Sequence, residues 1–272
     1  MRLLNGSDLA GFIKQRQAQQ VRALRQAHHL VPTLAIVQTR IDPVIDKYIQ
    51  LKKAYGADIL VEVHVHTVEQ SKALALIQNL NQDDSIHGII VQLPLPDPTQ
   101  TDTLVDAVTP AKDVDGLGQH AVLDPATPMA VNWLLAGYNV ELRGKKIVIV
   151  GQGRLVGKPL ARMFENSGYQ VATAHKGTEN LGELTRSADV LITAAGVPRL
   201  ITSDMIKPQA VVVDAGVATD AGKLVGDLAD DVRDRQDLTI TPPKGGVGPL
   251  TVCALFENVI RSVDALAATP QV

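Results

Sequence analysis

The sequence predicts an α/β protein of two domains, and three observations support this fold class. Short apolar runs typical of buried strands alternate with longer helix-favouring stretches along the chain. A polar segment from about residue 97 to residue 128 interrupts this alternation, and a glycine-rich turn opens the part that follows. A chain of 272 residues is long for one compact core and suits two domains.

The first half begins with a polar stretch, residues 7–29, that favours a helix, followed by a buried strand at residues 33–37. Asp42 can cap the next helix, since Pro43 suits the first helical position, and this helix should end near Gly56. These elements open an alternation of strand and helix.

The alternation continues with a half-exposed strand at residues 59–65, where valines alternate with polar residues. A helix over about residues 69–80 and a buried strand at residues 88–91 follow, and two prolines, Pro94 and Pro96, end that strand. This βαβα order predicts a parallel sheet.

The second half shows the pattern of a dinucleotide-binding unit. A strand at residues 145–150 leads into the glycine-rich turn 151–157 and a helix from near Leu155 to about Asn166, and Gly168 suits the residue after that helix. Further strands are expected at residues 170–174, 190–194 and 210–214. A strand, a glycine turn, a helix and a second strand within about 30 residues predict a Rossmann-type domain.

The glycine turn has the context that a dinucleotide site requires. Gly151 can make the tight turn, and Gly153 allows the backbone to approach a pyrophosphate at the positive end of the helix. The third glycine, Gly157, comes one position later than in the commonest spacing. The alternative is a tight turn without a ligand.

The end of the second strand of this unit indicates which dinucleotide it binds. An NAD site usually carries a carboxylate there for the ribose 2′-hydroxyl, whereas this chain has Lys176 near that position. A lysine would attract the additional phosphate of NADP, so NADP is the expected cofactor and NAD remains possible. The alternative for Lys176 is a solvated loop charge.

The composition excludes several classes of protein. A net charge of −3 argues against a general nucleic-acid binder, which needs a basic face. Cys253 is the single cysteine, so no internal disulfide forms and a cytoplasmic location is expected. No stretch approaches about 18 uninterrupted apolar residues, so we expect a soluble protein without a membrane partner.

One predicted strand face carries residues of types that bind metals. Glu62, His64 and His66 share that face, but no further ligand cluster accompanies them. A polar strand face is the commoner explanation, so no metal is predicted.

Several short motifs in a fixed order resemble the methylenetetrahydrofolate dehydrogenase/cyclohydrolase family, and the resemblance covers nearly the whole chain. The motifs are Tyr48-Ile-Gln-Leu-Lys52, Gly88-Ile-Ile-Val-Gln-Leu-Pro-Leu-Pro96, Lys112-Asp-Val-Asp-Gly116, Pro125-Ala-Thr-Pro128, the glycine turn through Gly157-Lys-Pro159, Asp214-Ala-Gly216, Gly226-Asp227 and Gly245-Gly-Val-Gly-Pro-Leu-Thr251.

The resemblance implies a folate-binding catalytic domain at residues 1–120, an NADP-binding Rossmann domain at residues 121–250, and a C-terminal helix at about residues 251–272 that returns to the first domain. It also implies a homodimer that serves one-carbon metabolism, including purine biosynthesis. Two reactions are implied: the oxidation of 5,10-methylenetetrahydrofolate to the 5,10-methenyl cation, and the hydrolysis of that cation to 10-formyltetrahydrofolate.

The resemblance also assigns site residues. Lys52 is implied as the principal catalytic residue with Tyr48 beside it, since residues four apart on a helix share one face. Gln92 would hydrogen-bond Lys52, and Asp115 would pair with the pterin ring. Each residue also has a purely structural explanation. Tyr48 and Lys52 could be an ordinary surface pair on a helix, and Gln92 could simply cap a strand. Asp113 or Asp115 could hold a turn before Gly116.

The remaining implied contacts lie in the second half of the chain. Gly245, Gly246 and Pro249 would close over the substrate side of the nicotinamide. The cofactor contacts would come from a set spread over three loops: Gly151, Gln152, Gly153, Lys176 and Val217.

Five positions depart from the family pattern. Arg40 and Ile45 replace a glycine and a serine before Tyr48. Gln152 replaces an arginine in the cofactor loop. Ala130 and Lys244 replace a glycine and a proline. These changes leave Lys52 and Gln92 in place.

Two other functions are the alternatives. One is an oxidoreductase of another small metabolite on the same scaffold, and the other is an NAD(P)-binding regulator without chemistry. A generic dehydrogenase has no need of a set made of Tyr48, Lys52, Gln92 and Asp115, so this set argues against the first. The presence of Lys52 and Gln92 argues against the second.

Overall fold

The computed structural model describes residues 1–220 and 223–267 and divides into two compact units. The six-stranded unit contains Met1–Ala10 and Thr127–Thr251. The three-stranded unit contains Gly11–Ala126 and, of the described residues that follow, 252–267. The expected two-domain α/β fold is confirmed.

The domain boundaries differ from the expected ones in two places. The first ten residues belong to the six-stranded unit, because β1 (Arg2–Leu3) pairs in parallel with β11 (Thr239–Ile240). The change between the units falls after Ala126 and not after residue 120, because the loop up to Asp124 is bonded to the three-stranded unit. Two-residue strands carry no periodicity, so the sequence could not indicate this pairing.

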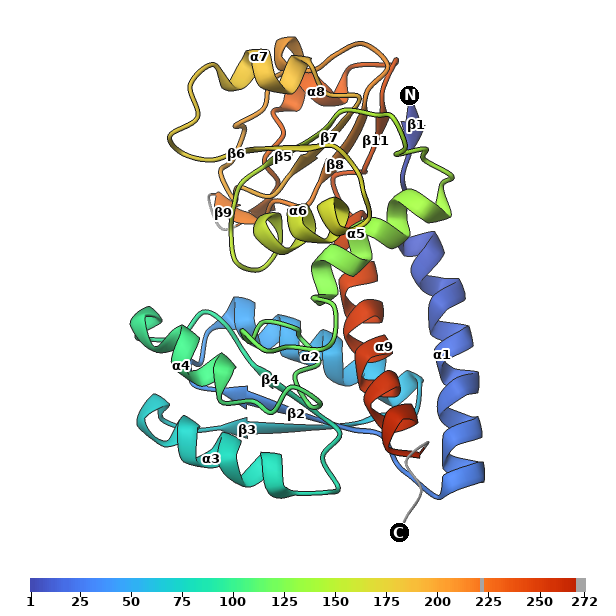
Figure 1. Cartoon of the computed structure of the whole chain (residues 1–272), viewed down its shortest axis with the longest axis vertical. Coiled ribbons are helices and arrows are strands. Elements are labelled where there is room, and N and C mark those ends of the chain that lie inside the picture. Colours follow the sequence, from blue (N-terminus) through green and yellow to red (C-terminus); the bar gives the residue numbers. More distant parts are fainter. Residues whose placement is uncertain (221–222, 268–272) are drawn as a thin grey trace. The chain divides into compact units, whose positions relative to one another are not determined.

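The three-stranded sheet has the order β3–β2–β4, and all of its strands are parallel (Figure 1). Its elements are β2 (Thr33–Gln38), α2 (Pro43–Asp58), β3 (Glu62–Thr67), α3 (Gln70–Gln82) and β4 (Gly88–Val91). Asp42 caps α2 as expected, since its carboxylate accepts a 2.9 Å hydrogen bond from the backbone N–H of Val44.

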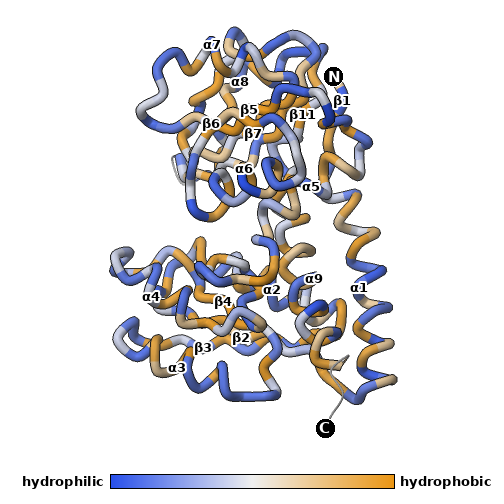
Figure 2. The backbone as a smooth tube through the Cα atoms, in the orientation of Figure 1, coloured by the Kyte–Doolittle hydropathy of each residue, from blue (hydrophilic) through white to orange (hydrophobic). Residues whose placement is uncertain are grey.

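Alternate residues of β2 and β4 fill one core of this unit. Ala35 and Val37 of β2 and Ile89 and Val91 of β4 pack against α3 and the short helix α4 (Thr101–Asp106). Figure 2 shows β2 and β4 as mainly hydrophobic. The fully buried run of β2 matches the expectation for a covered parallel strand.

Two long helices complete the three-stranded unit. The part of α1 (Gly6–His28) from Gly11 onward and the part of α9 (Val247–Ala267) from Val252 onward belong to it. Asn258 on α9 donates hydrogen bonds to the backbone oxygens of Val114 (2.9 Å) and Asp124 (2.8 Å). The C-terminal helix therefore packs on the first domain, as expected, while residues 268–272 of that prediction lie outside the described chain.

The six-stranded sheet has the order β1–β11–β8–β7–β5–β6, also with parallel pairing (Figure 1). Its expected elements are present as β5 (Ile147–Val150), α6 (Gly157–Asn166), β6 (Val171–Ala174), β7 (Val190–Thr193) and β8 (Val211–Asp214). Gly168 follows α6 with φ +80°, as expected for the residue that ends a helix.

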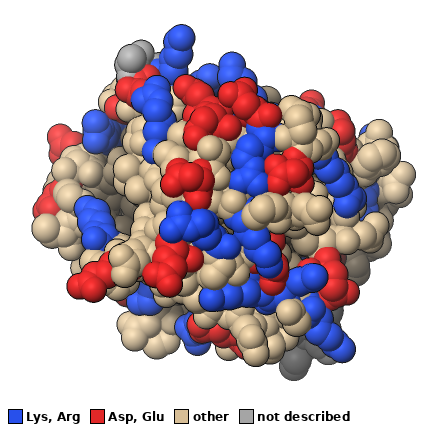
Figure 3. Space-filling view, turned by 90° about the horizontal axis from the view of Figure 1, so that it is seen from above, with Lys and Arg blue, Asp and Glu red and all other residues tan. Residues whose placement is uncertain are grey.

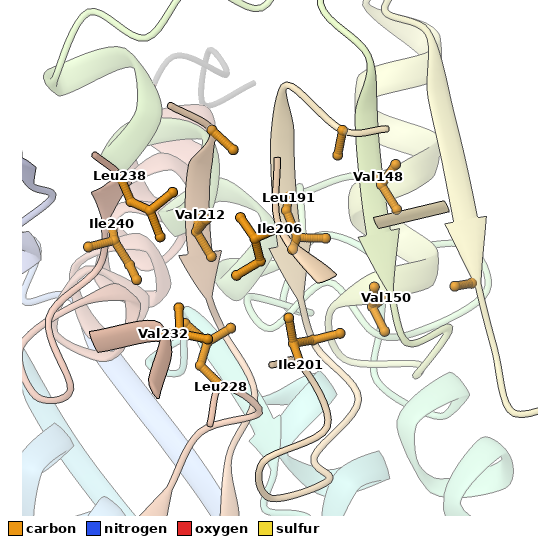
Figure 4. Close-up of a cluster of buried hydrophobic side chains, with 13 residues drawn as sticks. Val148, Val150, Leu191, Ile201, Ile206, Val212, Leu228, Val232, Leu238 and Ile240 are labelled. Atoms are coloured by element: carbon orange, nitrogen blue, oxygen red, sulfur yellow. The ribbon is translucent and has the colours of Figure 1, made fainter. Parts of the chain in front are cut away.

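Figure 4 shows the core on one face of this sheet. Val148 and Val150 of β5, Leu191 of β7 and Val212 of β8 point toward side chains from the connecting segments. Those side chains include Ile201, Ile206, Leu228 and Val232, the last from the short helix α8 (Asp230–Arg233).

Several elements were not predicted because they are short or lie in polar sequence. The segment expected to be a polar connection contains η1 (Pro98–Gln100) and α4, and α5 (Ala126–Gly137) begins at its end. The others are α7 (Leu181–Arg186), η2 (Ser203–Met205), α8, and the hairpin of β9 (Ala218–Asp220) and β10 (Lys223–Val225).

The charged side chains on the face drawn in Figure 3 are mixed, with Lys and Arg interspersed among Asp and Glu. Within the described chain, none of the helices has the length and hydrophobicity needed to cross a bilayer.

Candidate active site

The three-stranded sheet reverses its strand order at β2. The chain passes from β2 to β3 on one side and later returns to β4 on the other. Ligands of parallel α/β sheets bind beyond the carboxyl ends of the strands where the order reverses. Gln38 is the last residue of β2, and Gln92 follows the last residue of β4. The backbone N–H of Gln92 donates a 2.9 Å hydrogen bond to the backbone oxygen of Val37.

Lys52 reaches this edge from α2. Its Nζ donates a 2.7 Å hydrogen bond to Oε1 of Gln92 in a partly buried position. The amide nitrogen of Gln92 donates to the backbone oxygen of Leu93 at 2.9 Å, which fixes the orientation of the carboxamide. The expected contact between Lys52 and Gln92 is therefore present, and Lys52 is not a lysine that extends into solvent.

The loop that carries Asp115 is tied to the same strand. Ile89 of β4 forms an isolated parallel β-bridge with Asp113. The backbone N–H of Ile89 donates a 2.7 Å hydrogen bond to the backbone oxygen of Lys112. The carboxylate of Asp113 accepts hydrogen bonds from the N–H groups of Gly116 (3.0 Å) and Gly118 (2.8 Å). Of the two aspartates considered for this turn, Asp113 therefore holds it.

Asp115 and Lys52 influence each other electrostatically. Burial raises the pKa of Asp115 to about 6, an effect that the positive charge of Lys52 opposes and the negative charge of Asp113 increases. Burial lowers the pKa of Lys52, and the charge of Asp115 opposes that change. Between pH 3.8 and about 6 the folded protein holds a proton that the unfolded chain releases, so this group's stabilising contribution is lost as the pH rises through that range.

Tyr48 lies one turn before Lys52 on α2. Its side chain is 37% exposed, and partial burial raises the pKa of its hydroxyl. Residues four apart on a helix share one face, so its ring lies on the face that carries Lys52.

The segment before Tyr48 contains Arg40 and Ile45, the two residues there that depart from the family pattern. Ile45 is buried, so its side chain adds to the core that holds α2. Gln38 donates to the carboxylate of Asp46 at 2.7 Å and to the backbone oxygen of Arg40 at 3.0 Å. The side chain of Arg40 lies 3.4 Å from the carboxylate of Asp42.

The six-stranded sheet reverses its order between β5 and β7, and the glycine turn lies at this point. Gly151 has φ +101°, and a Cβ there would lie 2.4 Å from the backbone oxygen of Ala194, so the turn requires glycine. A Cβ at Gly153 would meet nothing within 4 Å, so this part of the loop is open to a ligand. A Cβ at Gly157 would lie 1.8 Å from the oxygen of Gly151, so the late third glycine lets the helix start pack on the turn.

The other expected cofactor residues follow strands of the same sheet. Lys176 is exposed in a turn after β6, where the N–H of Gly177 donates to Nδ1 of His175 at 3.0 Å. Val217 follows β8 and is 59% exposed. Gln152 donates to the backbone oxygen of Gly151 at 3.3 Å. Glycine, lysine and exposed apolar groups at one sheet edge fit the phosphates and rings of a dinucleotide.

Gly245, Gly246 and Pro249 belong to the six-stranded unit, whereas Tyr48, Lys52, Gln92 and Asp115 belong to the three-stranded unit. The oxygen of Gly245 accepts a hydrogen bond from the N–H of Ser7 at 3.0 Å.

The remaining two substitutions also lie in the six-stranded unit. Ala130 is fully buried in α5, and Lys244 is exposed.

The face of β3 that was considered for a metal site carries an interacting pair, His64 and Glu62. Nε2 of His64 lies 3.3 Å from the carboxylate of Glu62. Among residues 1–220 and 223–267, no group of three His, Cys, Asp or Glu side chains could hold a metal ion.

A glycine turn at the reversal point of a parallel sheet, in a chain that also holds a lysine–carboxamide pair at a second reversal point, defines a two-domain dinucleotide-binding enzyme. Family models agree: the tetrahydrofolate dehydrogenase/cyclohydrolase catalytic domain matches residues 4–115, and the NAD(P)-binding domain of the same family matches residues 125–267. The chain belongs to the tetrahydrofolate dehydrogenase/cyclohydrolase family.

Curated relatives match over nearly their whole length. The chain is 37% identical to the bifunctional protein FolD of Exiguobacterium sibiricum, over 96% of this chain and 98% of the relative. It is 39% identical to the bifunctional protein FolD of Amoebophilus asiaticus, over 99% of this chain and 97% of the relative.

A solved structure agrees equally well. The bifunctional enzyme FolD of Campylobacter jejuni aligns with a TM-score of 0.91 at 36% identity, covering 98% of this chain and 99% of that one.

We expect the carboxyl group of Asp115 to titrate near pH 6. Lys52→Met removes the positive charge that lowers this pKa, so the midpoint should rise. Carboxyl-carbon NMR of protein labelled with ¹³C-aspartate measures the midpoint, and Lys53→Met, at an exposed neighbouring position, is the control. A midpoint that falls in Lys52→Met, or that rises equally in the control, would contradict this electrostatic coupling.

Proposed function

We propose that the protein oxidises 5,10-methylenetetrahydrofolate to the 5,10-methenyl cation with NADP and hydrolyses that cation to 10-formyltetrahydrofolate. The observation that carries the proposal is the 2.7 Å hydrogen bond between Lys52 and Gln92, beside a carboxylate with a raised pKa. Perturbed ionisable groups at the reversal point of an α/β sheet are typical of catalytic sites. Membership of this dehydrogenase/cyclohydrolase family supplies the reaction class.

Lys52 is the group we assign to the hydrolysis. Burial lowers the pKa of its amine, so a larger fraction is neutral near pH 7 than for an exposed lysine. A cationic intermediate beside it would lower the pKa further. The neutral amine can take a proton from the water that attacks the methenyl carbon, while Gln92 holds the amine in place.

Asp115 is the group we assign to substrate orientation. The ring N–H and amino group of a pterin form a donor-rich edge, which an ionised carboxylate accepts well. The pKa of about 6 keeps most of Asp115 ionised at neutral pH, and the turn held by Asp113 fixes its backbone. Tyr48, one turn from Lys52, would contact the substrate on the same helix face.

The dinucleotide supplies the hydride acceptor when it is bound. Gly151, Gln152 and Gly153 would hold its pyrophosphate at the start of α6, and Val217 would contact its nicotinamide half. Lys176 would pair with the 2′-phosphate, which favours NADP. A relative of 28% identity from Trypanosoma brucei, with a TM-score of 0.91 and about 98% coverage of both chains, was solved complexed with NADP cofactor and inhibitor.

We extend the proposal to the assembly and location of the protein. A cytoplasmic homodimer that supplies 10-formyltetrahydrofolate to purine biosynthesis fits the family resemblance. Gly245, Gly246 and Pro249 would lie on the substrate side of the nicotinamide. A monomer mass in sedimentation equilibrium at micromolar protein would reject the homodimer.

The proposed reactions depend on Lys52, so Lys52→Ala should lower the rate of hydrolysis by at least about a hundredfold, because it removes the proton acceptor. Purified protein is mixed with 5,10-methylenetetrahydrofolate and NADP, and nicotinamide reduction and methenyl absorbance are followed together. Lys53→Ala, at an exposed position one residue along α2, should keep the rates of the unaltered protein.

Two outcomes would contradict the proposal. If folded protein binds NADP but reduces none of it with this substrate, the dehydrogenase assignment fails and a dinucleotide-binding regulator replaces it. If Lys52→Ala hydrolyses the methenyl cation at the unaltered rate, the role of Lys52 fails.

Cofactor preference should depend on Lys176. A hydrogen bond to a charged group contributes about 1.5–3 kcal/mol, so Lys176→Ala should reduce the preference for NADP over NAD by roughly ten- to a hundredfold. The measurement is kcat/KM for each dinucleotide, with Lys223→Ala at another exposed position as the control. An unchanged ratio in Lys176→Ala would show that this lysine does not contact the phosphate.

A further inference from the structure

Two of the sequence motifs, Asp214-Ala-Gly216 and Gly226-Asp227, have no role in the site described above. The structure packs each carboxylate against the glycine of the other motif. A Cβ at Gly216 would lie 2.2 Å from Cγ of Asp227, and a Cβ at Gly226 would lie 2.0 Å from Oδ2 of Asp214. The two motifs therefore form a single cluster in the six-stranded unit.

Asp227 is completely buried and holds the segment that follows β7. Its Oδ2 accepts a 2.7 Å hydrogen bond from the N–H of Ala195, and its Oδ1 accepts a 2.8 Å hydrogen bond from the N–H of Val197. Gly196, between these two residues, has φ +65°. One carboxylate thus fixes both ends of a tight turn.

Asp214 holds the segment that follows β8. Its Oδ1 accepts hydrogen bonds from the hydroxyl of Thr193 (3.0 Å) and from the N–H groups of Gly216 (3.2 Å) and Asp227 (3.1 Å). Arg233 lies 3.4 Å from its Oδ2 and also donates to the backbone oxygen of Thr241. Asp214 therefore joins β7, β8 and the loop that carries Asp227.

The two held segments lie at the cofactor edge of the sheet. The backbone oxygen of Ala194 contacts the glycine turn, since it would lie 2.4 Å from a Cβ at Gly151. A Cβ at Gly196 would lie 3.4 Å from the backbone oxygen of Val217. Val197 and Val217 are 41% and 59% exposed, and both come directly from these segments.

We propose that Asp227 and Asp214 are positioning residues for the dinucleotide: together they hold segments 194–197 and 214–217 in the conformation that binds its nicotinamide half. The inference rests on the proposed function, because it concerns the same cofactor site. Neither carboxylate contacts the cofactor itself. They act through the backbone of the two segments.

The chemistry of the turn explains why carboxylates are required. The N–H groups of Ala195 and Val197 are both donors, so they need two acceptor oxygens on one side chain. An asparagine at position 227 would have nearly the same shape but would place an NH₂ donor opposite one of these N–H groups. That mismatch should release one end of the turn while the fold is kept.

The test is the dissociation constant for NADP, measured by titration calorimetry on the full chain. Asp227→Asn should raise this constant by about tenfold or more, because one hydrogen bond to a charged group is lost. Thr193→Val, a milder change that removes one hydrogen bond to Asp214, should raise it less. Asp231→Asn is the matched control, because Asp231 accepts hydrogen bonds from the N–H (3.0 Å) and hydroxyl (2.6 Å) of Ser203 in the same unit.

Hydrogen exchange provides a readout that needs no cofactor. The amides of residues 194–197 should exchange faster in Asp227→Asn than in the unaltered protein, and Asp231→Asn should leave them unchanged. If Asp227→Asn does not fold, Thr193→Val decides the question by its effect on the NADP constant.

The outcomes separate this inference from the proposed function. If both test variants lower thermal stability but bind NADP as tightly as the unaltered protein, the carboxylates are structural and the inference is overturned. If the unaltered protein binds neither NADP nor NAD, the proposed cofactor site fails, and the inference fails with it.

Discussion

The three-stranded and six-stranded sheets of this protein are parallel, and each reverses its strand order once. At a reversal the loops on neighbouring strands leave in opposite directions, so the carboxyl ends of two strands face a space that side chains can line. In the three-stranded sheet this constraint places Gln92 at the end of β4, within 2.7 Å of Lys52 from α2. In the six-stranded sheet it places Gly151 beside Ala194. The chemistry described above follows from these two placements.

The loops and helices near these strand ends carry ionisable side chains that are buried or partly buried. Burial of a carboxylate or an amine disfavours its charged form, as the raised pKa of Asp115 and the lowered pKa of Lys52 show. Opposite charges and backbone N–H groups offset part of the free energy that is lost when these charged groups are removed from water. Asp115 is opposed by Lys52, whereas Asp113 and Asp227 accept backbone hydrogen bonds. Asp113 and Asp227 also fix the conformation of a loop through these hydrogen bonds.

Much of the fold could be predicted from the sequence, because long strands and helices carry strong local signals. The buried run of β2, the cap of α2 at Asp42 and the glycine turn after β5 all match. The pairing of Arg2–Leu3 with β11 could not be predicted, because two residues show no periodicity. The helix α5 was missed since it begins inside a segment that reads as polar and proline-containing. The family motifs indicated Lys52, Gln92 and Asp115, but physical reasoning alone would have favoured a surface role for Lys52. Asp113 was one of two candidates for holding its turn, because its contacts with Gly116 and Gly118 are local. The contacts of Asp214 and Asp227 join loops that are distant in the sequence, and no spacing reveals them.

The proposed function requires Lys52 and Gln92 to act as one unit at the reversal point of the three-stranded sheet. A double-mutant cycle on the rate of methenyl hydrolysis tests it most directly, with Lys52→Met, Gln92→Met and the double variant compared with the unaltered protein. If Gln92 acts only by holding the amine of Lys52, the double variant should be no slower than Lys52→Met alone. If instead the losses multiply, so that the double variant is slower than Lys52→Met by the full effect of Gln92→Met, the two residues act independently and do not form one unit.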